Sequence, residues 1–201
     1  MEIKNIYKSF GDNKVLENIS MRFDEGITCI MGPSGRGKTT LAYIIARLVA
    51  PDSGEISFPG GQKKISLMFQ EDRLLEWENA ISNVLFVTKS PILGGVRKKR
   101  EYLERGKELL TQAGLADSMY KKAAELSGGM KRRVCLCRAL IADYDLLILD
   151  EPFKGLDSGI KPSIMDMVKS HAAGKTVICI THDPAEAEFL GGELVAVNRL
   201  E

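Results

Sequence analysis

The chain has 201 residues, of which 44% are hydrophobic and 27% charged, the balance of an ordinary globular protein. Its 28 Lys and Arg residues against 27 Asp and Glu residues leave a formal net charge of +1, which argues against nucleic-acid binding through bulk positive charge. The first fifteen residues contain no apolar core of a signal peptide, and no apolar run approaches membrane-spanning length. We therefore expect a cytoplasmic protein with one domain and an inserted subdomain.

The first predicted elements are strands. Apolar Ile19, Met21 and Phe23 alternate with polar neighbours, which is the period of a half-buried strand, so we expect an antiparallel sheet at the start of the chain. Residues 27–31 form a short apolar run of the kind that is buried on both faces of a parallel sheet.

Helical spacing follows this second strand. Apolar residues recur at helical intervals over residues 38–49, and residues 50–54 predict the turn that ends the helix. Strand signal nearly vanishes over 71–125, where charged helical segments such as 101–113 predict a helical subdomain. Buried strands return at 146–149 and 176–180, separated by a helix at about 161–171. This order predicts an α/β fold.

Four cysteines are present without a CxxC pair: Cys29, Cys135, Cys137 and Cys179. Their spacing does not favour a metal site. We expect free thiols that serve as small core residues in a reducing compartment.

Residues 32–39 match the phosphate-binding pattern G-x-x-x-x-G-K-[ST] at every fixed position. Glycines let successive backbone N–H groups point into one concavity, and the helix expected from Lys38 adds its positive end. Lys38 would then reach the β- and γ-phosphates, the Thr39 hydroxyl would bind Mg²⁺, and Thr40 would bond the α-phosphate. A glycine turn that fits by chance is the alternative, but the flanking strand and helix favour nucleotide binding. The predicted loop comprises Gly32, Pro33, Ser34, Gly35, Arg36, Gly37, Lys38 and Thr39.

Two carboxylates end the apolar strand at 146–149. Strand ends in α/β sheets face the ligand crevice, so Asp150 would hold Mg²⁺ through water while Glu151 polarises the attacking water. The alternative is an exposed acidic turn before Pro152, which the preceding phosphate loop disfavours.

A second glycine-rich segment lies at residues 126–130, Leu-Ser-Gly-Gly-Met. Ser127 would cap the helix that follows, whose apolar face includes Met130 and Val134. Gly128 and Gly129 would also leave a bare, positively polarised helix end able to approach phosphate. Spacing alone does not decide between a capped helix and a phosphate contact.

The ordered motifs together resemble the ATP-binding subunit of an ATP-binding cassette (ABC) transporter over nearly the whole chain. They are GPSGRGKTT (Walker A), Gln70, LSGGM (the family signature), LLILDEP (Walker B), GLD at 155–157, and Thr181-His182-Asp183. The resemblance implies a P-loop NTPase of ABC type, with a mixed-sheet core, an antiparallel β subdomain and an inserted α-helical subdomain. It also implies ATP and Mg²⁺ as ligands.

In this family two cassettes close head to tail around ATP. Carried over, Ser127, Gly128, Gly129 and Met130 would face the nucleotide held by a partner subunit, so the resemblance implies a dimer, in the simplest case a homodimer. Asp157 would reach across that interface.

The resemblance assigns three further roles within the site. Gln70 would contact Mg²⁺ and the attacking water, and His182 would contact the γ-phosphate. The alternative is that His182 is a loop residue before Pro184 with no catalytic role. Phe10 lies where the family places an aromatic ring on adenine, with simple packing as its alternative.

An importer subclass is indicated by residues 69–77 followed by Asn83-Val84, which resemble the ATPases of nitrate, sulfonate and taurine importers. Glu76 stands where proline is usual. The neighbourhood of Trp77 is where the family receives a membrane subunit, although Trp77 could instead anchor the helical subdomain. The implied partners are transmembrane permease subunits and, indirectly, a solute-binding protein, with the ATPase peripheral on the inner face of the membrane and no nucleic acid.

We expect one ABC ATPase domain over 1–201, with the nucleotide-binding core at 1–69 and 126–201 and the helical subdomain at about 70–125. Since the chain ends 19 residues after His182, we expect no C-terminal regulatory domain. Two alternatives stay open: a non-transport ABC ATPase of the cell-division or iron–sulfur assembly type, and a nucleotide-responsive binding module. The basic run at 97–100 predicts a solvated helix start rather than a lipid contact.

Overall fold

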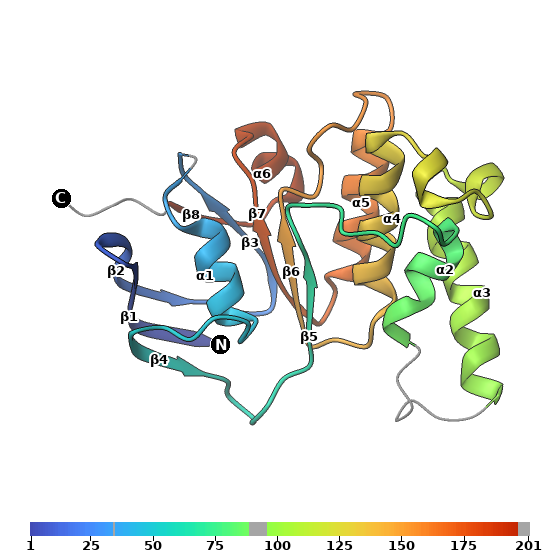
Figure 1. The fold of residues 1–201 in the computed structure, drawn as a ribbon. Coiled ribbons are helices and arrows are strands. Elements are labelled where there is room, and N and C mark those ends of the chain that lie inside the picture. Colours follow the sequence, from blue (N-terminus) through green and yellow to red (C-terminus); the bar gives the residue numbers. More distant parts are fainter. Residues whose placement is uncertain (34, 89–95, 197–201) are drawn as a thin grey trace. The chain divides into compact units, whose positions relative to one another are not determined.

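A computed structural model of the chain describes residues 1–33, 35–88 and 96–196 (Figure 1). Two compact units divide it: the first takes residues 1–67, 144–151 and 172–201, and the second takes 68–143 and 152–171. No helix in the described ranges is long and apolar enough to cross a membrane. The described strands are β1 (Glu2–Phe10), β2 (Asn13–Arg22), β3 (Gly26–Met31), β4 (Ser53–Ser57), β5 (Ile65–Met68), β6 (Leu146–Asp150), β7 (Thr176–Ile180) and β8 (Glu193–Ala196). The helices are α1 (Lys38–Ile45), α2 (Ala80–Leu85), α3 (Val96–Gln112), α4 (Gly128–Ile141), α5 (Lys161–His171) and α6 (Pro184–Leu190), with 3-10 turns η1 (Phe86–Thr88), η3 (Ala116–Ser118) and η4 (Ala123–Glu125).

The predicted antiparallel sheet opens the first unit, with strand order β2-β1-β4. Ile3 pairs with Met21 across β1 and β2, which places the alternating apolar side chains on one face. The last two residues of the predicted turn at 50–54 belong instead to strand β4, which begins at Ser53. A Cβ on Gly54, whose φ is +102°, would lie 2.4 Å from the carbonyl oxygen of Asn5, so only glycine allows β4 to approach β1 here.

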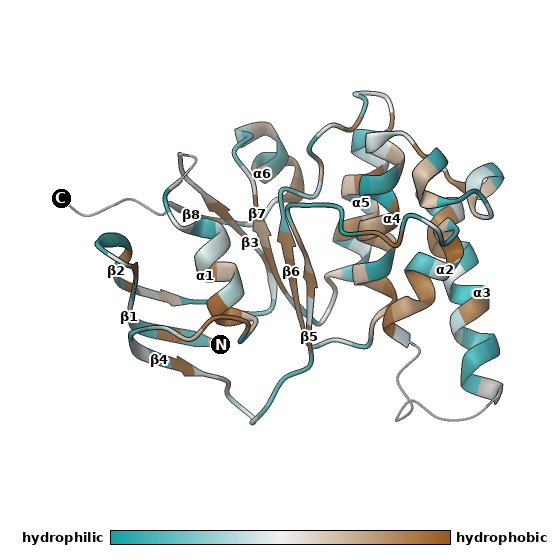
Figure 2. Ribbon diagram, viewed as in Figure 1, coloured by the Kyte–Doolittle hydropathy of each residue, from teal (hydrophilic) through white to brown (hydrophobic). Residues whose placement is uncertain are grey.

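The parallel sheet of the first unit has the order β5-β6-β7-β3-β8. Strands β6, β7 and β3 run parallel in register, with Leu149 opposite Cys179 and Cys179 opposite Cys29. The apolar colouring of these three strands in Figure 2 agrees with the continuous hydrophobic runs that predicted them. Strand β8, which pairs with β3, was not predicted because only four residues carry it.

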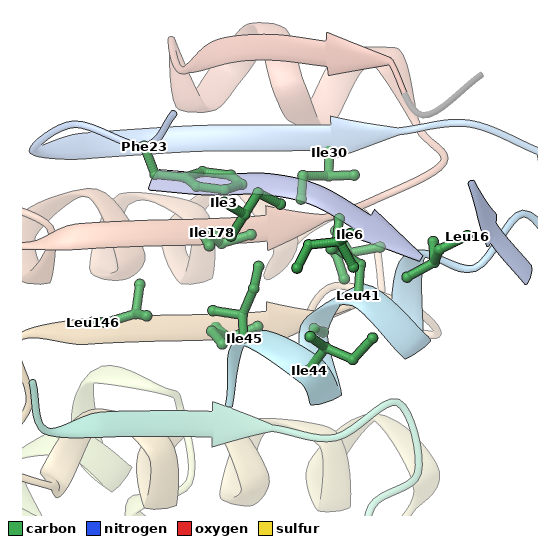
Figure 3. Close-up of a cluster of buried hydrophobic side chains, with 13 residues drawn as sticks. Ile3, Ile6, Leu16, Phe23, Ile30, Leu41, Ile44, Ile45, Leu146 and Ile178 are labelled. Carbon is green, nitrogen blue, oxygen red and sulfur yellow. The ribbon is translucent and has the colours of Figure 1, made fainter. Parts of the chain in front are cut away.

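Helix α1 packs its apolar face into the core of the first unit. Leu41, Ile44 and Ile45 are buried with Ile3 and Ile6 of β1 and with strand residues of the parallel sheet (Figure 3). The helix ends at Ile45, four residues before the predicted end at Val49. Arg47 takes the left-handed conformation with φ +60°, which stops the α-helical ladder there.

The second unit is helical, and the predicted helical subdomain at about 70–125 lies within it. Helix α4 packs against α2 and α3, and these three helices carry the buried residues Ile81, Val84, Leu110 and Leu140. At the start of α3, Lys98, Lys99 and Arg100 are exposed, as expected for a solvated basic run, while the Arg97 side chain lies outside the described residues.

The four cysteines are buried free thiols, which confirms their predicted place in the core. Burial raises the pKa of both Cys135 and Cys137 to about 12, because a thiolate would be poorly solvated there. Their thiols therefore stay protonated near neutral pH.

Candidate nucleotide site

The predicted phosphate loop joins β3 to α1 in the first unit. Its last glycine, Gly37, is the N-cap residue of α1 and has φ +79°. A Cβ at this position would lie 2.7 Å from Leu16 Cδ2 and 2.8 Å from the carbonyl oxygen of Val15. A larger residue would meet both a strained backbone and a clash, so the loop geometry requires glycine here.

The Lys38 side chain is buried against the loop and does not extend into solvent. Its Nζ donates to the carbonyl oxygens of Gly32 at 2.7 Å and Pro33 at 2.8 Å, and the side chain is buried. Pro33, Gly35 and Arg36 are exposed on the outer side of the loop, and Ser34 lies outside the described residues. The ammonium group is thus held against the backbone of the loop that would receive an anion.

Thr39 and Asp150 meet at the carboxyl end of the parallel strands. The Thr39 Oγ1 donates a 2.7 Å hydrogen bond to Asp150 Oδ2, although the two residues come from α1 and the end of β6. Asp150 is buried, and Thr40 next to Thr39 is partly buried. A hydroxyl and a carboxylate oxygen side by side are ligands of the type that Mg²⁺ prefers.

Glu151 and His182 face each other at neighbouring strand ends. His182 Nδ1 lies 3.5 Å from Glu151 Oε1, and the Glu151 amide donates to the carbonyl oxygen of Ile180 at 2.9 Å. The Glu151 side chain is 12% exposed and that of His182 is 61% exposed. Glu151 has φ +50°, an unfavourable conformation for a residue with a Cβ, and such strain is held where the surrounding structure determines it.

Hydrogen bonds of Thr181 and Asp183 hold the turn that carries His182. The Thr181 hydroxyl donates a short hydrogen bond to the buried Glu186 carboxylate and accepts one from the Asp183 amide at 3.1 Å. Asp183 in turn caps α6 by accepting from the Ala185 amide at 3.0 Å. These bonds hold the backbone on both sides of His182 while its imidazole faces solvent.

Phe10 ends β1 with an exposed ring. The ring is 53% exposed, and Lys8 Nζ lies 5.4 Å from its centroid. Asp52 accepts hydrogen bonds from Lys8 Nζ at 2.7 Å and from the Ser9 amide at 2.6 Å, and the Lys8 bond, followed by the Ser9 bond, lowers the pKa of the Asp52 carboxyl. The exposed ring is consistent with the predicted stacking surface and not with core packing.

The signature segment lies at the start of α4 in the second unit. Ser127 Oγ accepts from the Met130 amide at 3.3 Å, so Ser127 caps the helix as predicted. A Cβ on Gly129 would lie 3.1 Å from the carbonyl oxygen of Gly155, which brings the signature close to the segment that carries Asp157. Asp157 itself is exposed, and Ser127 and Gly128 are exposed at the bare helix end.

Gln70 also belongs to the second unit, and its carbonyl oxygen accepts a 2.8 Å hydrogen bond from Arg132 Nη1. Arg132 was not among the site residues predicted from the sequence. The structure buries this guanidinium to 4% exposure. No local sequence signal marks it, because Lys131 and Arg133 on either side make this position resemble a solvated helix surface.

Comparisons with known proteins now decide the family. The model of the ABC transporter family matches residues 16–154. The taurine import ATP-binding protein TauB of Escherichia coli O157:H7 is 35% identical over 208 residues, covering 98% of this chain and 79% of that protein. The aliphatic sulfonates import ATP-binding protein SsuB of Rhodopseudomonas palustris (strain BisA53) is 37% identical over 206 residues, covering 98% and 70%. This chain belongs to the ABC transporter family.

The fold agrees with that membership. The ATP-binding cassette MJ0796, solved as a dimer in a post-hydrolysis state bound to ADP and Pi, has a TM-score of 0.84 and 30% identity, covering 97% of this chain and 93% of that one. The predicted P-loop NTPase fold of ABC type, which combines an antiparallel sheet, a parallel sheet and helices, is confirmed. As an ABC cassette, the chain is an ATPase that binds ATP and hydrolyses it to ADP and phosphate.

Proposed function

We propose that this ABC cassette powers a bacterial importer for a small solute of the nitrate or sulfonate kind. The ATPase part of this proposal is carried by the pairing of Thr39 with Asp150 and of Glu151 with His182, beside one glycine-rich loop. Import is supported by relatives that are named as import ATP-binding proteins for taurine and aliphatic sulfonates. The cassette would then work at the inner face of the membrane.

ATP would bind over the phosphate loop, with its adenine on Phe10. The loop amides and Lys38 would receive the phosphates, with Nζ exchanging the carbonyl oxygens of Gly32 and Pro33 for β- and γ-phosphate oxygens. Arg36 and Gly35 would line the exposed outer side. The loop is already curled, so little reorganisation beyond Lys38 is needed.

Thr39 and Asp150 would hold Mg²⁺, with Asp150 acting through water and Gln70 contributing when it reaches the nucleotide. Bound there, the cation would neutralise charge on the β- and γ-phosphates. The buried Asp150 orients the Thr39 oxygen through their 2.7 Å hydrogen bond. The Thr39 hydroxyl and the Asp150 carboxylate both offer oxygen ligands, which suits a hard cation.

Glu151 would orient the attacking water and take its proton as the water oxygen bonds to the γ-phosphorus. The bond from that phosphorus to the bridging oxygen of ADP breaks, and ADP and phosphate result. His182, 3.5 Å from Glu151, would contact the γ-phosphate and stabilise the charge that develops there.

A second cassette would complete the site, in the simplest case an identical one. Ser127, Gly128, Gly129 and Met130 would face the nucleotide of the partner subunit, since Ser127 and Gly128 are exposed at a helix N-terminus. The exposed Asp157 would meet the partner across the interface. The dimeric state of the similar cassette MJ0796 supports this arrangement.

The loop around Trp77 would receive the permease. Trp77 is 71% exposed, and the fully buried Asn83 side chain forms hydrogen bonds with the backbone of the Trp77 loop. The Asn83 side chain accepts from the Leu75 amide at 2.8 Å and donates to the carbonyl oxygens of Leu75 at 3.0 Å and Glu78 at 3.3 Å. An exposed aromatic ring on an ordered loop is suited to burial in a protein interface. A solute-binding protein would act only through the permease, and nucleic acid has no part in the proposal.

Co-expression with the neighbouring membrane-protein genes tests the proposal. We expect a multi-span membrane protein to co-purify with the wild-type chain and with Leu48→Ala, an exposed apolar control, but not with Trp77→Ala. Reconstituted in vesicles with solute, the complex should release phosphate. Absence of any multi-span partner would instead favour a non-transport cassette. A complex that binds ATP without releasing phosphate would favour a nucleotide-responsive module.

A further inference from the structure

Side chains of α4 form hydrogen bonds with residues 69–76, which we call the Gln70 segment. Arg132 Nη1 donates to the carbonyl oxygens of Phe69 at 3.0 Å and Gln70 at 2.8 Å, and to Asp72 Oδ1 at 3.0 Å. The guanidinium is 4% exposed. A single buried cation thus binds the backbone carbonyl groups on both sides of the Gln70 Cα, and also the Asp72 carboxylate.

Three other side chains of α4 bind the same segment. The Cys135 thiol donates to the carbonyl oxygen of Asp72, and Arg138 Nη1 donates to that of Arg73 at 2.8 Å. Lys131 Nζ lies 3.0 Å from both carboxylate oxygens of Glu76. Arg132, Cys135 and Arg138 repeat at three-residue intervals and so share one helix face over about two turns.

The same helix begins at the signature, with Ser127 as its N-cap only five residues before Arg132. Backbone hydrogen bonds join each turn of an α-helix to the next, so the two ends of a short helix move largely as one body. Drawing the Gln70 segment away from α4 would remove three acceptors from a buried guanidinium, which costs more than losing a surface pair. The segment and the signature helix are therefore bound to move together.

We propose that Arg132 is a positioning residue that fixes the backbone of Gln70 to the signature helix, so that the Gln70 side chain and the signature engage nucleotide in one movement. This inference rests on the proposed function, because it takes Gln70 as a contact of Mg²⁺ and the attacking water. Arg132 itself touches no nucleotide and acts through Gln70.

A double-mutant cycle of ATP hydrolysis tests this role. We expect Gln70→Ala and Arg132→Ala each to lower kcat about tenfold or more, with the KM for ATP little changed, since a displacement of about 1 Å in a catalytic group costs this much. The double variant should hydrolyse no more slowly than Gln70→Ala alone, because Arg132 acts through Gln70. Arg105→Ala is the matched control. The Arg105 side chain, on α3, donates to the carbonyl oxygen of Leu140 on α4 at 3.2 Å, and among the described residues it forms no hydrogen bond with the Gln70 segment. Additive losses in the double variant would overturn the proposal.

Amide hydrogen exchange separates failure of this inference from failure of the proposed function. If Gln70→Ala hydrolyses ATP normally, the assigned role of Gln70 is wrong and the proposal falls with it. If Gln70→Ala is impaired, Arg132→Ala should speed amide exchange over residues 69–76 while Arg105→Ala leaves it unchanged. Arg132→Lys, which keeps the charge but not the forked donors, serves where Arg132→Ala does not fold, and should give the same result in weaker form. Unchanged exchange over 69–76 in both Arg132 variants would overturn the inference.

Discussion

Thr39 and Asp150, 111 positions apart in the chain, are joined by a 2.7 Å hydrogen bond from Oγ1 to Oδ2. This bond connects the first turn of α1 to the end of β6, so the phosphate loop and the acidic strand end form one site. The hydroxyl is held by a buried carboxylate before any nucleotide arrives. Such preorganisation lowers the reorganisation needed when a phosphate-bound cation enters.

Replacing Thr39 by valine keeps the shape of the side chain and removes its hydroxyl. We expect hydrolysis to need about tenfold more Mg²⁺, because one oxygen ligand is lost and Asp150 is left without its donor. Titration of phosphate release against MgCl₂ measures this, with Thr39→Ser as the control that keeps the hydroxyl. Chelation of the metal should stop hydrolysis in all three proteins. The same Mg²⁺ dependence in the valine variant and the wild type would exclude Thr39 as a ligand.

Replacing Lys38 by alanine removes the cation that bonds Gly32 and Pro33 within the loop. ATP affinity should fall about tenfold or more, since one charge-assisted contact to phosphate is worth about 1.5–3 kcal/mol. Fluorescence titration with a labelled ATP analogue provides the measurement. Lys4→Ala, a lysine exposed on β1, should bind like the wild type. Equal affinity in both variants would count against the proposed binding mode.

The two histidines of the chain provide a matched pair of variants. His182→Ala should lower the hydrolysis rate about 100-fold and leave ATP affinity within about twofold, because the imidazole is proposed to act mainly on transition-state charge. His171→Ala should hydrolyse ATP normally: this residue ends α5 and its Nδ1 lies 2.9 Å from the Met167 carbonyl oxygen. Steady-state phosphate release compares the two. A normal rate for His182→Ala would remove His182 from the mechanism.

Periodicity and motif spacing predicted the central elements because burial on both faces selects continuous apolar strands, as at 146–149 and 176–180. Periodicity did not predict the end of α1 or the start of β4, because both depend on the backbone conformation of single residues. The end of α1 follows from the left-handed Arg47, and the approach of β4 to β1 follows from Gly54. Neither conformation is encoded in a hydrophobic period.

Sequence motifs also located the loop, the strand-end acids and His182, since these residues occur at fixed offsets from buried strands. They could not locate Arg132. A charged residue next to Lys131 and Arg133 resembles a solvated helix surface, and only the fold brings the carbonyl oxygens of residues 69 and 70 within reach of it. Tertiary contacts of this kind have no local sequence signal.

The buried thiol of Cys137 predicts a pH dependence of stability. Burial raises its pKa from the usual 9.0 to about 12, so above about pH 9 the unfolded chain loses a proton that the folded chain keeps. The stability contributed by the neutral thiol is complete below pH 9 and is lost as pH rises toward 12, by up to about 1.4 kcal/mol per pH unit. Guanidinium unfolding at several pH values from 8 to 11 should show a smaller fall for Cys137→Ala than for the wild type. Parallel curves would contradict the assigned burial effect.

Light scattering of Glu151→Gln with saturating ATP and Mg²⁺ tests whether Glu151 drives hydrolysis in a nucleotide-bound dimer. Glutamine fills the same space as Glu151 but cannot take the proton of the attacking water. We predict a persistent species of twice the 22.2 kDa chain mass for the variant, while the wild type returns to monomer as ATP is consumed. A Glu151→Gln protein that stays monomeric with saturating ATP would show that Glu151 does not drive hydrolysis in such a dimer.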